Sequence, residues 1–128
     1  MKTEIPSEII EKYGINLLVL FGSYADGTNR QDSDLDLAFL SKEILSLDKE
    51  HTLLEEMIGY YRKGNLDLVN LRKATPALKL EVANKGKLLY GTEEDFLNFQ
   101  LYAARYYADT KYLRLEREKY LKMRLSEL

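Results

Sequence analysis

The chain has 128 residues, of which 45% are hydrophobic, and it carries a formal net charge of −2 at pH 7. This length and apolar content predict one compact domain with its own core. The slightly negative charge excludes the broad basic surface that binds nucleic acid or an anionic membrane, because such surfaces need a clear excess of lysine and arginine. The absence of cysteine excludes disulfides, zinc-thiolate sites and cysteine nucleophiles.

The sequence shows neither a signal peptide nor a membrane span. Its first residues, MKTEIPSEIIEKYG, have charges spread through them, whereas a signal peptide needs an uninterrupted apolar core. No segment approaches the roughly 20 apolar residues of a membrane-spanning helix. We therefore expect a soluble protein of the cytoplasm.

Helices and strands are predicted to alternate along the first 90 residues. A short helix over 6–13 ends at Gly14, and the continuous apolar run 15–21 predicts a strand covered on both faces. The elements that follow are a strand at 35–40, a helix at about 48–63 that stops at Gly64 and Asn65, a strand at 66–71, a helix from Thr75 and Pro76 to Gly86, and a short edge strand at 87–90. This order is an α/β pattern with few, short strands.

One long helix is predicted from a cap at Thr92 to about Leu125. Three acidic residues follow Thr92, and neither glycine nor proline interrupts the segment. Its apolar side chains fall on two faces. The face expected to pack against the body of the domain consists of Leu97, Leu101, Ala104, Ala108, Tyr112 and Leu115. The second face consists of Phe99, Tyr102, Tyr106, Leu113 and Tyr120.

A small domain seldom buries two faces of one helix. The second face is therefore either self-packed or covered by a partner protein or a second copy of the chain. Beyond Lys111 the helix is basic, which favours the helix dipole and also suits an acidic partner or RNA. We expect residues 1–92 to form the main domain and residues 93–128 to form a C-terminal helix, part of the same compact unit, that contacts a partner.

Two carboxylates lie at the start of the second predicted strand, within LFGSYADGTNRQDSDLDLAFL, residues 20–40. Residues two apart on a strand share a face, so Asp34 and Asp36 converge while Leu35 turns toward the core. Such a pair persists when one acid is protonated or when a cation lies between them. Taken alone, the two acids are equally consistent with a helix cap or an exposed strand end.

A phosphate-binding turn and a third acid extend this pattern. Gly22 lets the backbone approach a ligand closely, and Ser23 offers an amide and a hydroxyl donor, although by themselves they predict an ordinary strand-to-helix turn. Asp67 begins the strand 66–71 and can reach Asp34 and Asp36 if the two strands are neighbours. Magnesium is held by carboxylates together with substrate phosphates, so the three acids and the turn indicate phosphoryl or nucleotidyl transfer.

The stretch GSYADGTNRQDSDLD resembles the pattern Gly-Ser, ten residues, Asp-x-Asp of the nucleotidyltransferase superfamily, which includes DNA polymerase beta and the aminoglycoside adenylyltransferases. It closely resembles the minimal members, the MNT-domain proteins that serve as antitoxins to HEPN-domain toxins. The likeness continues through LDLVNLRKATPALKLEVANKGKLLYG. The resemblance implies a nucleotidyltransferase fold, with a small mixed sheet flanked by helices and a long C-terminal helix.

The resemblance also implies roles for individual residues. Gly22 and Ser23 would bind the phosphates of the nucleotide. Asp34 and Asp36 would hold two magnesium ions, and Asp67 would complete the metal site and help to deprotonate the acceptor.

Position 26 departs from the family pattern. Many relatives have arginine or lysine just before the second glycine, whereas this chain has Asp26 before Gly27. An acid at that position removes one phosphate contact, so Arg30 becomes the nearer candidate to bind the nucleotide.

The function implied by the resemblance is that of an antitoxin enzyme. It would transfer AMP from ATP to a hydroxyl group, a tyrosine of a cognate HEPN ribonuclease toxin, and so neutralise that toxin. The chain is too short for the additional domain with which antibiotic-modifying relatives hold their acceptor. Two alternatives stay open: an antitoxin that blocks its toxin by contact alone, and a small-molecule adenylyltransferase of the aminoglycoside type. A homo-oligomer within the complex is a further expectation.

Overall fold

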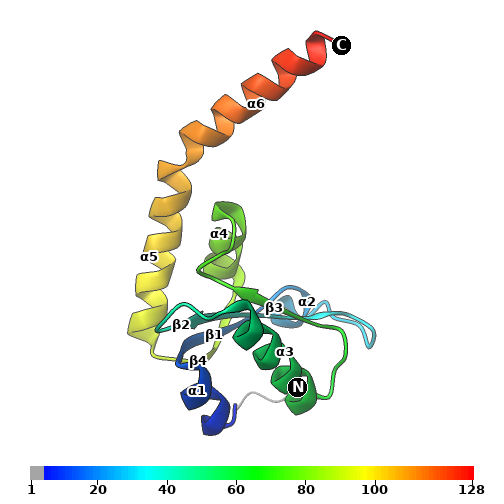
Figure 1. Ribbon diagram of the computed structural model, residues 1–128, viewed down its shortest axis with the longest axis vertical. Helices are drawn as coiled ribbons and strands as arrows, with labels where there is room; N and C mark the ends of the chain where they lie inside the picture. The colour runs from blue at the N-terminus through cyan, green and yellow to red at the C-terminus, as the bar shows by residue number, and fades with distance from the viewer. Residues whose placement is uncertain (1–4) are drawn as a thin grey trace.

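A computed structural model of the chain describes residues 5–128. Its centre is a four-stranded mixed sheet between two layers of helices (Figure 1). The strands are β1 (Ile15–Phe21), β2 (Leu35–Ser41), β3 (Leu66–Asn70) and β4 (Lys87–Tyr90), in the spatial order β3-β2-β1-β4. β1 pairs antiparallel with β2 and β4, and β2 pairs in parallel with β3. The predicted α/β fold with a small mixed sheet is confirmed.

The helices within residues 5–128 are α1 (Ser7–Tyr13), α2 (Ser23–Asp26), α3 (Leu47–Tyr61), α4 (Pro76–Lys85), α5 (Glu93–Asp109) and α6 (Lys111–Ser126). One face of the sheet packs against α1 and α3, and the other packs against α4 and α5. Within β1, Leu18 and Leu20 face the first layer, whereas Leu17 and Val19 face the second. All four are at most 5% exposed, as expected for a strand covered on both faces.

Local capping signals place several helix ends correctly. The Thr75 hydroxyl accepts a hydrogen bond from the amide of Leu78 at the start of α4, and Thr92 does the same for Asp95 at the start of α5. Gly14 has the left-handed conformation predicted for the end of α1, with φ +60°.

The predicted end of α3 at Gly64 and Asn65 is wrong. The left-handed residue is Arg62, with φ +53°, so the helix ends two residues earlier. A non-glycine residue in this conformation needs support from tertiary contacts. Lys63 and Asn65, which follow Arg62, both hydrogen-bond to backbone carbonyls of the loop that precedes β2, and these contacts fix the turn.

The predicted single C-terminal helix is interrupted at Thr110. The Thr110 hydroxyl donates to the carbonyls of Tyr106 (2.8 Å) and Tyr107 (3.2 Å), and such bonds to the preceding turn bend helices. The Arg114 guanidinium contacts the Thr110 hydroxyl and donates to the Tyr107 carbonyl at 2.7 Å. Threonine and arginine side chains therefore produce a bend that the absence of glycine and proline did not suggest.

The face of α5 that packs against the domain also differs from the prediction. Leu97 and Leu101 were expected to be buried, but they are 53% and 62% exposed. The buried residues are Phe99 and Ala103, which pack against α4 and β1. Ala103 has a small side chain that allows close approach, whereas leucines on the neighbouring face have no layer to contact.

α6 extends away from the rest of the molecule (Figure 1), and no residue of it is buried. Large apolar side chains nevertheless occur along its length, with Tyr112 and Leu125 each 67% exposed. Among residues 5–128, the structure contains no helix with the length and apolar character needed to cross a membrane.

Candidate nucleotide-transfer site

The candidate site lies at the edge of the sheet where β1 ends and where β2 and β3 begin. Asp36 on β2 is directly opposite Asp67 on β3 in the parallel register. On its other side, Asp36 is opposite Phe21, the last residue of β1. Asp34 immediately precedes β2, two residues from Asp36. The sheet topology thus brings residues from three separate segments to one edge.

Gly22 is fitted closely against Asp36. A Cβ atom on Gly22 would collide with the Oδ2 atom of Asp36. The backbone of Gly22 also has φ +74°, a conformation that other residues rarely adopt. Glycine is therefore required here for two reasons, and the first of them keeps the carboxylate of Asp36 beside the turn that leads into α2.

The three aspartates differ in their surroundings. Asp34 and Asp67 are exposed, whereas Asp36 is half-buried. Burial raises the pKa of the Asp36 carboxyl above its ordinary value. The carboxylates of Asp67 and Asp34, and then that of Glu81 on α4, raise it further. Negative charge is thus concentrated around Asp36, and a bound cation would relieve the repulsion.

Glu81 was not singled out from the sequence. It lies on α4, far along the chain from the Asp34 and Asp36 pair, and only the packing of α4 over the sheet brings it close enough to influence Asp36. A glutamate in an amphipathic helix gives no sequence signal of such a role.

The turn that follows Gly22 forms the short helix α2, which begins at Ser23 and ends at Gly27 in a left-handed conformation. Asp26 stabilises this end, because its carboxylate accepts a hydrogen bond from the amide of Thr28 at 3.0 Å. The hydrogen bonds from Thr28 also lower the pKa of Asp26. The acid that departs from the family pattern therefore has a local structural role.

Arg30 lies in the exposed loop between α2 and β2. Its backbone amide donates to the Ser33 hydroxyl at 2.7 Å, and the Ser33 amide donates to the Arg30 carbonyl at 3.1 Å. These bonds define the loop backbone close to Asp34. Within residues 5–128 the Arg30 guanidinium forms no ion pair, so its binding to phosphate stays a prediction.

Asn65 anchors the same loop from the neighbouring turn. Its side-chain amide donates to the carbonyls of Asp32 (3.0 Å) and Ser33 (3.1 Å), and its own carbonyl accepts from the amide of Leu35 at 3.0 Å. These bonds fix the backbone on both sides of Asp34. The sequence suggested only a helix stop at Asn65, because its partners are about 30 residues away in the chain.

The ligand atoms available at this edge are carboxylate oxygens, which are the donors that magnesium prefers. The close fit of Gly22 to Asp36 and the raised pKa of Asp36 are both consistent with a cation held there. As the side chains are placed, however, no three acidic or histidine residues of the described chain are gathered into a metal-binding group.

Known proteins that are similar to this chain include nucleotidyltransferases and toxin-antitoxin complexes. The family model described as "Polymerase beta, Nucleotidyltransferase" matches residues 4–95. The protein adenylyltransferase MntA of Shewanella oneidensis is 33% identical over 104 residues, which are 81% of this chain and 72% of MntA. A crystal structure of a toxin-antitoxin with AMP-PNP has a TM-score of 0.75 at 28% identity and covers 93% of this chain and 94% of that chain. A structure of tri-AMPylated Shewanella oneidensis HEPN toxin in complex with MNT antitoxin has a TM-score of 0.68 at 26% identity, with 93% and 92% covered.

Proposed function

This chain belongs to the polymerase beta nucleotidyltransferase family, and we propose that it transfers AMP from ATP to a hydroxyl group of a HEPN-domain toxin, which neutralises the toxin. The observation that carries this proposal is the register of the sheet, which sets Asp36 opposite Asp67 and beside Gly22. The similarity to MntA and to toxin-antitoxin complexes containing AMP-PNP or an AMPylated toxin supports the choice of nucleotide and partner.

In the proposed reaction, the acceptor hydroxyl oxygen forms a bond to the α-phosphorus of ATP. The bond between that phosphorus and the oxygen bridging to the β-phosphorus breaks, and pyrophosphate leaves. The hydroxyl proton passes to a carboxylate oxygen of Asp67, which is exposed and therefore accessible to an acceptor. Gly22 and Ser23 bind the triphosphate through the backbone and hydroxyl donors of the turn. Arg30 is assigned a supporting phosphate contact.

Asp34, Asp36 and Asp67 would hold magnesium, for which we propose two ions. When bound, magnesium neutralises phosphate charge and stabilises the negative charge that develops during transfer. The chain contributes the arrangement of the acids: two strands fix Asp36 and Asp67, and Asn65 fixes the backbone on either side of Asp34.

We assign residues 1–92 to the catalytic unit and residues 93–128 to partner binding. α6 buries none of its residues, yet it carries Tyr112, Leu113 and Leu121 at 50% exposure or more. It also has six lysine or arginine residues and two glutamates, a charge that suits an acidic surface on the toxin. A homo-oligomer within the complex would use the same helix.

The test is to replace Asp67 with asparagine in the protein purified together with its cognate toxin. Asp67→Asn changes charge but little volume, so the complex should persist in a pull-down while AMP transfer is abolished. Transfer is measured as adenylyl mass added to the toxin, by intact-protein mass spectrometry with magnesium or with chelator. Asp32→Asn is the matched control, because Asp32 is an exposed aspartate of the nearby loop and its side chain has no assigned role.

Four results would contradict parts of this proposal. Near-normal transfer by Asp67→Asn means that Asp67 is not the third acid, and full activity in chelator removes magnesium from the reaction. If the parent protein neutralises the toxin without adding mass, the antitoxin acts by contact alone. Labelling of an aminoglycoside without a partner would instead identify a small-molecule adenylyltransferase.

A further inference from the structure

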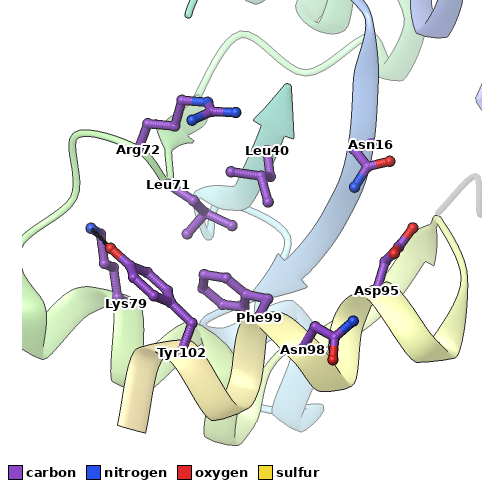
Figure 2. Close-up of a pocket in the computed structure, with 9 residues that line it drawn as sticks. All are labelled: Asn16, Leu40, Leu71, Arg72, Lys79, Asp95, Asn98, Phe99 and Tyr102. Carbon is purple, nitrogen blue, oxygen red and sulfur yellow. Dashed lines mark hydrogen bonds between the residues drawn. The ribbon is translucent and has the colours of Figure 1, made fainter. Parts of the chain in front are cut away.

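A pocket lies at the end of the sheet opposite to the aspartates. Asn16 is near the start of β1 and Leu40 is near the end of β2, whereas Phe21 and Asp36 occupy the other ends of these strands. The pocket has a volume of about 370 Å³, which lies within the usual range for small-molecule sites. It is lined by Asn16, Leu40, Leu71, Arg72, Lys79, Asp95, Asn98, Phe99 and Tyr102 (Figure 2).

A buried lysine forms part of the pocket wall. Lys79 on α4 is 5% exposed, and its Nζ atom donates to the Tyr102 hydroxyl at 3.0 Å. The same atom lies 4.5 Å from the ring centroid of Tyr106. Among residues 5–128, no carboxylate forms an ion pair with Lys79. A buried charge without a counterion is unfavourable, so an anion entering the pocket gains a strong electrostatic partner.

Arg72 provides a second cation whose position is fixed by the backbone. Its Nε and Nη2 atoms donate to the carbonyl of Ser41 at 3.2 and 2.8 Å, and Nη2 also donates to the carbonyl of Lys42 at 3.1 Å. Neither interaction supplies negative charge. These bonds use the Nε proton and both Nη2 protons, so the Nη1 group is the part of the guanidinium that can donate to a carboxylate oxygen of a ligand.

The remaining lining residues define the other parts of a ligand. In Figure 2, the apolar side chains of Leu40, Leu71 and Phe99 lie between the cations on one side and a polar group on the other. That polar group consists of Asn16, Asp95 and Asn98. From one side of the pocket to the other, the lining side chains therefore change from positively charged, through apolar, to hydrogen-bonding and acidic.

We propose that this pocket binds a small aromatic carboxylate with a hydroxyl or amine group at its opposite end. The carboxylate accepts hydrogen bonds from Lys79 and Arg72. The ring packs mainly on the half-buried Leu40, because Leu71 and Phe99 are only 1% and 5% exposed. The hydroxyl or amine donates to Asp95 at the opposite end. Five segments of the chain converge on the pocket, namely β1, β2, the turn after β3, α4 and α5, and a recess of this kind fits a free small molecule better than a flat protein surface.

The experiment uses the full chain and 4-hydroxybenzoate, with 4-hydroxybenzyl alcohol as the probe that lacks the carboxylate. Calorimetric titration should detect binding of the acid in the millimolar range or tighter. The affinity for the alcohol should be lower by about tenfold or more, because the alcohol lacks the charge-assisted hydrogen bonds of the carboxylate. Lys79→Met, which keeps most of the side-chain volume, should weaken binding of the acid to a similar extent. Lys73→Met is the matched control, since Lys73 pairs with Glu50 outside the pocket.

Nuclear magnetic resonance on the parent protein gives a test that does not depend on a variant folding. 4-Hydroxybenzoate should shift the side-chain amide signals of Asn16 and Asn98 but not the backbone amides of Gly22 and Ser23. Saturating ATP should leave these shifts unchanged.

The proposal is overturned if neither probe binds up to about 10 mM, a concentration that corresponds to very weak affinity. It is also overturned if the acid and the alcohol bind equally, if Lys79→Met binds like the parent, or if ATP displaces the acid. If Lys79→Met weakens the complex with the toxin while 4-hydroxybenzoate does not bind, the pocket receives a side chain of the partner instead of a free carboxylate.

Discussion

β2 and α6 are both rich in large apolar residues, but the structure uses them in opposite ways. Leu37 on β2 is 0% exposed, whereas Leu113 on α6 is 64% exposed. β2 is the second strand of a sheet with helices on both faces, while α6 lies beyond the last element that could cover it (Figure 1). Apolar content alone thus does not identify a core. We therefore expect β2 to contribute to folding stability, whereas the exposed apolar residues of α6 are available for binding.

The largest expected effect tests the β2 side of this comparison. Phe39 is 1% exposed and packs in the layer formed with α3. Phe39→Ala should lower the free energy of unfolding by about 3–5 kcal/mol, because it removes buried surface and leaves a cavity. On α6, Leu113→Ala should change it by less than about 0.5 kcal/mol. Urea denaturation of both variants measures the difference, and similar losses would contradict the assignment of stability to the sheet.

The next effect concerns the loop that carries Asp34. Asn65→Ala removes two hydrogen bonds to carbonyls of this loop and should cost about 1–2 kcal/mol. AMP transfer should fall more than ATP binding, because the loop positions the acids while Gly22 and Ser23 remain in place.

Asn29→Ala is the matched control for this substitution, since Asn29 is an exposed asparagine of the same loop. If Asn65→Ala loses stability but transfers AMP at the parent rate, Asn65 supports the fold without positioning the site.

A smaller effect depends on alkaline pH. Burial raises the pKa of Tyr61 to about 12, and among residues 5–128 its hydroxyl has no hydrogen-bond partner. Above pH 10 the unfolded chain releases this proton while the folded chain keeps it, so stability falls as the pH rises from 10 toward 12. Tyr61→Phe should remove about 1 kcal/mol of this loss at pH 11.

Thermal denaturation at pH values from 8 to 11 measures this loss of stability. Tyr112→Phe on α6 is the matched control for removing a hydroxyl from an exposed tyrosine. An unchanged pH dependence in Tyr61→Phe would show that the folded protein ionises Tyr61 readily.

The smallest expected effect on stability comes from the α6 side of the comparison. A chain ending at Thr110 should unfold within about 0.5 kcal/mol of the full protein, because α6 has no buried residue. ATP binding should be retained, whereas binding to the toxin should weaken by about tenfold or more through loss of the apolar surface. If the shortened chain fails to fold, α6 belongs to the folding unit and the comparison with β2 does not hold.

Much of the fold was predictable because its signals are local. Thr75, Thr92 and Gly14 act within one helical turn of their positions, and the apolar run of β1 reflects burial on both faces. The sequence predicted that Asp67 lies near Asp36 only if their two strands are neighbours. The parallel pairing of β2 with β3 meets this condition. The faces of α5 could not be distinguished from the sequence, because both have apolar residues at helical spacing and only the position of α4 and β1 selects Phe99 and Ala103.

The sequence by itself determined the alternation of helices and strands from α1 to β4 and the caps at Gly14, Thr75 and Thr92, since each depends on neighbours within a few residues. Only the tertiary structure decided where α3 ends. Arg62 takes a left-handed conformation there, and Asn65, which follows it, hydrogen-bonds to the loop before β2. The tertiary structure likewise decided that Glu81 approaches Asp36 and that Lys79 is buried without a carboxylate beside it. Such features depend on distances between segments far apart in the chain, which arise only when the helices pack on the sheet.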